Sequence, residues 1–475
     1  MVWTGQKPRN ARPPDSLPNS VGLAWLMAGL LCASVAAATD ESTLPPPAAP
    51  SHPLLAETGV LPGAGDRFDW HLQATYVEQQ SDRFRSPYQG VNSLPSAQGR
   101  ETLDFTLYVG ARLWQGAELW LDPELDQGFG LGNTTGLAGF GSGEAYKVGS
   151  AHPYLRWQRA FLRQTWNLGG AQSPVEPAAN QFAASLTEDR IVLWLGKFSV
   201  GDLFDANRYA HDPRADFLNW SVIDTGSFDY AADAWGYTFG AAAEWYHGPW
   251  TLRTGVFDAS TVPNSPLLER GTDEFQLIAE FERRYGIGER GGKIALTSFM
   301  THARMALLGD ALRSGNSAGM PPDPALVRSP RERYGVALNL EQELSASVDA
   351  FLRAGRSGGN VETYDFTDID RTIAAGLALD GKAWDRPHDS IGLAGVRNQA
   401  SALRLRYLAA GGLGVLTGDG RLPHAGAERL VEAYYRITLV KGLDLTVDYQ
   451  YVANPAYNRD RGPVSLGAVR LHLQY

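Results

Sequence analysis

The chain has 475 residues, a formal net charge of −10, 52 glycines and 13 tryptophans. Its mean hydropathy of −0.25 excludes a protein built from membrane-spanning helices, and its acidic balance argues against nucleic-acid binding, which needs a basic surface. This mean hydropathy does not exclude a transmembrane β-barrel, because every second residue of each of its strands is polar.

Residues 1–38 have the order of a secretory signal peptide. Basic residues precede an apolar core, Val21–Val35, and three alanines at 36–38 offer a cleavage site. Cys32 is the one cysteine of the chain and lies in this core, preceded by a leucine rather than by the small residue of a lipoprotein site. We therefore expect export without lipidation and a mature chain without disulfides.

Residues 39–65 are rich in proline and alanine and are expected to form an extended N-terminal tail. Residues 66–475 are expected to form one β-barrel domain. They contain about sixteen alternating segments of the roughly 9–11 residues that a tilted membrane strand needs. No stretch after residue 38 has the run of about 18 apolar residues typical of a membrane helix.

The clearest segment is Leu103–Leu121, in which apolar residues occupy every second position. This period of two predicts two strands, each with one apolar and one polar face. Leu113 opposite Ala117 keeps the apolar residues together and leaves Trp114–Gly116 as a three-residue loop that ends in a left-handed glycine.

In this register the polar face of the hairpin carries paired groups. Arg112 faces Glu118, and Tyr108 faces Asp122. A soluble sandwich would turn this face to water, whereas a transmembrane barrel would turn it to the lumen. One hairpin does not separate the two folds.

Later segments repeat the alternation of apolar and polar residues. Short and long connections follow one another between these segments. This order is typical of an outer-membrane barrel with short periplasmic turns and long extracellular loops. Residues 167–188 interrupt it, being long where a short turn is expected. The clearest later strands are Trp235–Trp245, Trp250–Val256, Phe275–Phe281, Tyr334–Leu340, Leu344–Ala354, Val431–Leu439, Leu443–Tyr449 and Val469–Tyr475. Short turns are expected at 114–116, 246–249, 286–291, 341–343 and 440–442, and long links at 80–99, 123–153, 199–231, 301–330 and 398–426.

The chain ends on an amphipathic strand whose last residue, Tyr475, is aromatic. Such an end resembles the feature that the outer-membrane assembly machinery reads, which makes that machinery an expected partner during biogenesis. An ordinary final strand is the alternative.

Several blocks, in this order, resemble the carbohydrate-selective outer-membrane porin family (OprB family). The blocks are LWLDPELDQGFGLGNTTGLAGFGSGEAYKVG, YLRWQRAFLRQTWNLGG, GKFSVGDLFDANRYAHDPRADFLNW, GPWTLRTGVFDAS and EAYYRITLVKGLDLTVDYQYVANPAYNRD. The resemblance implies an all-β, antiparallel barrel of about 16 strands in the Gram-negative outer membrane. It further implies a monomer that contacts membrane lipid and passes sugars by diffusion. The Pro-rich tail and the long N-terminus are not part of the family pattern.

Sugars offer hydroxyls and weakly apolar ring faces, which arginine forks, carboxylates and aromatic rings can contact. The expected inward positions supply such residues: Tyr108, Arg112, Glu118, Asp122, Arg253, Arg353, Glu432, Tyr434 and Arg436. The last three are expected to face Gln450, Asp448 and Thr446. Balanced charge on facing walls would favour neutral solutes over ions. An inward Arg–Glu pair that only braces the wall is the alternative.

The segment Tyr154–Trp166 shows no clean alternation, and the resemblance places Arg159 and Arg163 inside. Trp194 is an inward candidate for ring stacking, with an interfacial girdle position as its alternative. Lys197 is a further pore-lining candidate. It begins a polar segment that in the family dips toward the pore.

The predicted function is passive, carbohydrate-selective diffusion of mono- and small oligosaccharides into the periplasm. A general diffusion porin, a barrel enzyme and a secreted polysaccharide-binding protein are the alternatives. An enzyme is not expected, because the nine histidines and the absence of a G-x-S-x-G segment offer no convincing catalytic set. No cofactor and no metal are expected. Asp122, Glu124 and Asp126 alternate, but Phe129 and Leu131 then occupy positions where a calcium loop needs oxygen ligands.

Overall fold

The computed structural model describes residues 67–269 and 271–475. The expected signal peptide (1–38) and tail (39–65) lie outside these residues. The strands are β1 (Phe68–Ser81), β2 (Gly99–Trp114), β3 (Ala117–Gly128), β4 (Ser150–Val175), β5 (Ala184–Phe198), β6 (Thr238–His247), β7 (Trp250–Asp258), β8 (Phe275–Ile287), β9 (Arg290–Met305), β10 (Ser329–Glu343), β11 (Val348–Ser357), β12 (Arg371–Asp380), β13 (Ser390–Gln399), β14 (Glu428–Val440), β15 (Leu443–Ala453) and β16 (Val464–Gln474). The α-helices are α3 (Trp220–Ile223), α4 (Leu308–Ala318) and α5 (Ala402–Ala409), and the 3₁₀ turns are η1 (Leu131–Thr134), η2 (Val200–Asp202), η3 (Pro324–Leu326), η4 (Gly381–Trp384) and η5 (Pro455–Tyr457).

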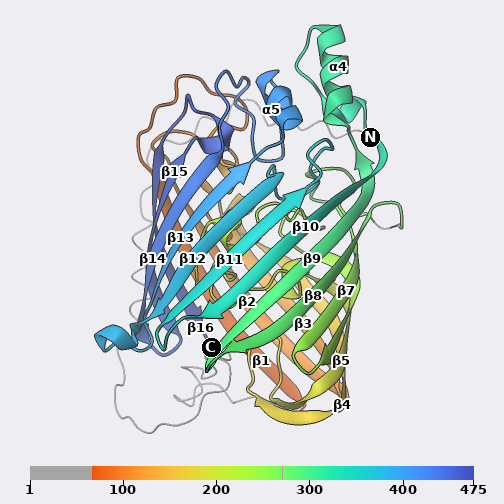
Figure 1. Ribbon diagram of the computed structural model, residues 1–475, viewed down its shortest axis with the longest axis vertical. Helices are drawn as coiled ribbons and strands as arrows, with labels where there is room; N and C mark the ends of the chain where they lie inside the picture. The colour runs from red at the N-terminus through yellow and green to blue at the C-terminus, as the bar shows by residue number, and fades with distance from the viewer. Residues whose placement is uncertain (1–66, 270) are drawn as a thin grey trace. The chain divides into compact units, whose positions relative to one another are not determined.

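The sixteen strands form one closed antiparallel barrel (Figure 1). Each strand pairs with its neighbours in the chain, and β1 closes the ring against β16. The barrel expected from the alternating pattern is therefore confirmed. Within the described residues, no helix is long and apolar enough to cross a membrane.

Alternation along each strand separates an apolar outer face from a polar inner face. In β2, Val109 is 39% exposed, whereas Thr106 and Tyr108 are buried. Arg112 pairs in register with Glu118, as predicted.

The turn after β2 is tighter than predicted. Trp114 pairs with Ala117, so the turn is the two residues 115–116, and Leu113 becomes the extra residue of a β-bulge. Gly116 supplies the positive φ (75°) that this turn needs. Leu439 is bulged out in the same way before the turn at 441–442.

The two ends of the barrel differ in the length of their connections. At the end we call the turn end the connections are 115–116, 176–183, 248–249, 288–289, 344–347, 381–389 and 441–442. At the opposite loop end they are 82–98, 129–149, 199–237, 259–274, 306–328, 358–370, 400–427 and 454–463.

Two predicted connections are wrong. The expected long link at 167–188 is mostly strand, because β4 continues to Val175 and β5 begins at Ala184, leaving 176–183 as the connection. The turn expected at 341–343 lies at 344–347, since β10 continues through Glu343.

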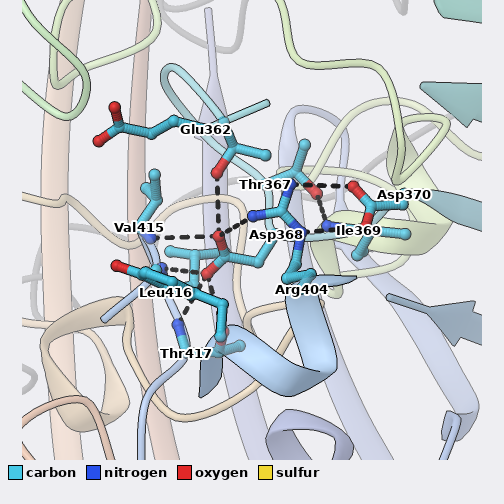
Figure 2. A network of polar contacts seen from close by, with 12 residues as sticks. Glu362, Thr367, Asp368, Ile369, Asp370, Arg404, Val415, Leu416 and Thr417 are labelled. Atoms are coloured by element: carbon cyan, nitrogen blue, oxygen red, sulfur yellow. Dashed lines mark hydrogen bonds and ion pairs between the residues drawn. The ribbon is translucent and has the colours of Figure 1, made fainter. Parts of the chain in front are cut away.

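The long connections pack on one another at the loop end (Figure 2). Asp368, from connection 358–370, is fully buried and accepts hydrogen bonds from the backbone N–H groups of Leu416 and Thr417 at 2.8 and 2.9 Å. Arg404 of α5 donates two hydrogen bonds of 3.0 Å to Asp370. Burial alone would raise the pKa of Asp370, but the charge of Arg404 outweighs it and holds this pKa below its usual value. At the loop end, hydrogen bonds and ion pairs therefore hold the connections to one another.

Candidate functional site: the lumen wall

Connection 199–237 runs into the lumen and contacts the inner face of the barrel. We describe this inner face in two regions. We call the inner side chains of β2, β3, β4 and β5 the β2–β5 wall. Seven predicted residues lie on it: Tyr108, Arg112, Glu118, Asp122, Arg159, Arg163 and Trp194.

A β-bulge explains why β4 shows no clean alternation in the sequence. Asp122 pairs with Arg159 but Pro123 pairs with Trp157, so Gln158 is the extra residue. Gln158 and Arg159 therefore both face the lumen, and the inward parity changes at this point. The structure places Arg159 and Arg163 inside, as the family resemblance implied.

Nearest the turn end, the wall combines an ion pair with stacked rings. Arg163 forms an ion pair with Glu118 and lies over the ring of Trp194, 4.9 Å from its centroid. Trp194 stacks on Phe161 at 4.9 Å and donates a 2.9 Å hydrogen bond to Glu244. This level places aromatic rings next to charged groups.

At the next level, toward the loop end, an arginine joins the wall to connection 199–237. Arg159 donates to both carboxylate oxygens of Asp202, at 2.8 and 2.6 Å. Its guanidinium also lies 3.8 Å from Asp122, which is buried. The arginine is thus shared between a wall carboxylate and a loop carboxylate.

A third level is centred on Arg214, which connection 199–237 brings into the lumen. Its guanidinium lies 3.4 Å from Glu144, 3.5 Å from Glu124 and 3.7 Å from Asp104. Glu124 also accepts a 2.6 Å hydrogen bond from Thr106. Three levels of arginine and carboxylate therefore follow one another along the β2–β5 wall.

This wall has acceptor capacity that the protein does not use. Within the described residues, Oδ1 of Asp122, Oε1 of Gln158 and Oδ1 of Asn180 are buried and have no hydrogen-bond partner. Leaving a buried polar atom unpaired costs about 1–3 kcal/mol.

On the opposite side, the predicted residues hold the inserted connection instead. Arg353 is fully buried and donates to the carbonyl oxygens of Val222 (2.5 Å) and Asp205 (2.8 Å). Glu432, also fully buried, accepts from the backbone N–H of Asn219 at 3.2 Å. Both side chains therefore anchor the connection.

Three other predicted residues outside the β2–β5 wall differ in their contacts. Tyr434 packs edge-on against Phe217, which belongs to connection 199–237, with ring centroids 4.9 Å apart. Arg436 pairs in register with Thr446, as expected. Arg253 lies within 2.9 Å of three carboxylates, those of Glu244, Glu280 and Glu282.

Lys197 does not lie on the inner face. In register it pairs with Ala160 and with Phe239, which is 50% exposed on the outer surface. Its ammonium folds back at the strand end to reach Asp233 at 3.0 Å. The expectation that Lys197 lines the pore is therefore corrected by its strand parity.

Three residues that form these levels were missed from the sequence. Asp104 and Glu124 occupy inward positions of the first predicted hairpin, and its alternation alone could have identified them. Arg214 lies in a connection without periodicity, so alternation does not place it in the lumen, although the family resemblance implied that its segment dips toward the pore. The described part of the chain holds no cluster of three or more His, Cys, Asp or Glu side chains suited to a metal ion.

The family model for the carbohydrate-selective porins, OprB family, matches residues 92–475. The chain belongs to the OprB family. No sequence relative was found among curated proteins. Among solved structures, Pseudomonas putida OprB at high pH matches with a TM-score of 0.66 and 14% identity, covering 86% of this chain and 94% of that one. Pseudomonas aeruginosa OccK8 (OprE) matches with a TM-score of 0.44 and 11% identity, covering 87% and 99%.

As an OprB-family protein, the chain is an outer-membrane porin. Its turn end faces the periplasm and its loop end faces the cell exterior, as in other barrels of this membrane. A sixteen-stranded barrel is wide enough for an aqueous channel. In this porin, connection 199–237 comes from the exterior end and contacts the inner side chains of Arg159, Arg353 and Glu432.

Proposed function

We propose that this porin passes neutral mono- and small oligosaccharides by passive diffusion, and that the β2–β5 wall is its selective surface. The observation that carries the proposal is the series of three arginine–carboxylate levels on one side of the lumen, beside the stacked Phe161–Trp194 pair. Planar donors and carboxylates suit hydroxyl pairs, and a ring face suits the apolar face of a sugar.

The balance of charge on this wall supports preference for neutral solutes. The arginines of the three levels, Arg159, Arg163 and Arg214, already lie next to carboxylates, so an ion that enters must compete with an existing partner. A neutral sugar carries no charge that must displace such a partner. Among the described residues, Arg353 and Glu432 on the other side are fully buried and offer no comparable surface.

The proposal includes the route to the membrane. Residues 1–38 direct export and are removed, residues 39–65 remain as a tail, and the assembly machinery inserts the barrel as a monomer. The protein acts as a channel and not as an enzyme. A general diffusion porin remains the second candidate, since its fold would be the same.

A liposome swelling assay separates the two candidates. Proteoliposomes should swell faster in glucose and maltose than in salts or amino acids of matched size. Equal rates would indicate a general porin. Trp194→Ala should lower the preference for sugars, whereas Trp245→Ala, a control tryptophan exposed on the outer face, should leave it unchanged.

A further inference from the structure

The periplasmic connection between β4 and β5 lies inside the barrel mouth. Connection 176–183, which we call the exit turn, is closed by two reciprocal 2.9 Å hydrogen bonds between the backbones of Ala178 and Gln181. Asn180 donates a 2.9 Å hydrogen bond to Asp122. Asp122 lies five residues beyond Ala117, the first residue of β3, and therefore roughly 17 Å along the strand from the turn end.

The ends of β4 and β5 next to the exit turn contain irregularities that bend the hairpin. The β4–β5 ladder shifts register twice, around Gly169 and before Gln172, and such bulges bend and twist a hairpin. Gly169 and Gly170 both have positive φ, at 148° and 87°. In Figure 1 the yellow end of β4 curves at the bottom of the barrel.

Side-chain contacts hold the exit turn against the β2–β5 wall. Phe182 is buried, with its ring 5.1 Å from that of Trp120. The guanidinium of Arg112 lies 4.7 Å from the centre of the Phe182 ring, and it also donates to the carbonyl of Ala183. Trp120 is itself placed by Gly110, because a Cβ there would lie 2.6 Å from the indole ring.

We propose that the exit turn forms a second constriction, on the periplasmic side, and that Asn180 and Phe182 are specificity-determining residues for solutes leaving the pore. The inference rests on the proposed function for the nature of the solute. Asn180 is partly exposed and its amide is held beside Asp122, so this amide can contact a solute that passes the exit turn. Phe182 limits the width beside Arg112.

Ion conductance in planar bilayers tests the constriction independently of sugar preference. With porin purified from outer membranes, the double variant Asn180→Ala/Phe182→Ala should raise single-channel conductance, because pore width limits ion flow. Glucose block of the current should weaken roughly fivefold, as expected for the loss of one net hydrogen bond. The control is Leu344→Ala/Ser345→Ala, in the exposed turn between β10 and β11, which should behave as wild type.

Conductance equal to that of the control variant would overturn the exit constriction and leave the proposed function standing. A raised conductance without any sugar preference in the wild-type porin would instead overturn the function and support the constriction.

Loss of Phe182 from a packed site can impair folding, so a milder variant accompanies it. Asn180→Cys should react with a charged thiol reagent and lose conductance on reaction, whereas Ser345→Cys should react without a change. Reaction at residue 180 that leaves the conductance unchanged would contradict the proposal.

Discussion

At the scale of single residues, Arg214 places a positive charge among three carboxylates of the lumen. Arg214→Ala should make the porin more cation-selective. A unit charge at about 4 Å in water is worth ~1 kcal/mol, so the K⁺/Cl⁻ permeability ratio should rise roughly fivefold. Reversal potentials in a KCl gradient measure this ratio. Arg214→Lys keeps the charge and should remain near wild type, and an unchanged ratio in the alanine variant would count against Arg214 facing the ion path.

Asp224, which follows α3, gives the stability of the lumen connection a pH dependence. Burial raises the pKa of Asp224 to about 6, although His211 at 3.6 Å opposes the shift. The folded chain therefore favours the protonated form. The resulting stabilisation is complete below pH 3.8 and is lost as the pH rises through about 6, which amounts to ~3 kcal/mol.

Asp224→Asn should remove this dependence. In non-ionic detergent, the unfolding temperature of the variant should exceed that of the wild type at pH 7 and approach it at pH 4. Asp385→Asn, at an exposed aspartate, is the matched control. A constant difference between variant and wild type across this range would contradict the assignment.

At the scale of elements, connection 199–237 is held in the lumen by side chains of the wall opposite β2–β5. Arg353→Met should leave the carbonyls of Asp205 and Val222 unpaired and lower stability by about 3–5 kcal/mol. The connection should then move more, so single-channel currents should become larger and noisier. Arg356→Met, three residues along β11 and exposed, should change neither the current nor the unfolding temperature.

Alternation of polar and apolar residues predicts which way most strand residues face, including Tyr108, Glu118 and Glu432. It fails at β4, because the bulge at Gln158 changes parity within one strand. It also does not show what fills the lumen. Arg163 lies beside the stacked rings of the wall, whereas Arg353 is fully buried under connection 199–237. This difference depends on the long-range folding of that connection. The same limit applies to Arg214 and to the exit turn.

At the scale of the whole molecule, stability depends on ring closure, since a closed barrel leaves no strand edge unpaired. Closure joins β1 to β16, and the last residue takes part in it. The backbones of Leu72 and Tyr475 exchange two hydrogen bonds, of 3.1 and 2.8 Å. The ring of Tyr475 stacks on Trp70 with centroids 4.7 Å apart. The terminal aromatic therefore has a structural role in addition to its predicted role in assembly.

Tyr475→Ala should weaken closure by about 0.5–1.5 kcal/mol, the worth of an aromatic pair. The fraction of porin that stays folded in SDS before heating should fall, as should its amount in outer-membrane fractions. Tyr475→Phe is the matched control, because within the described residues the phenol oxygen has no hydrogen-bond partner. The phenylalanine variant should therefore match wild type in both measurements. Equal losses in the two variants would show that the hydroxyl, and not the stacked ring, supports closure.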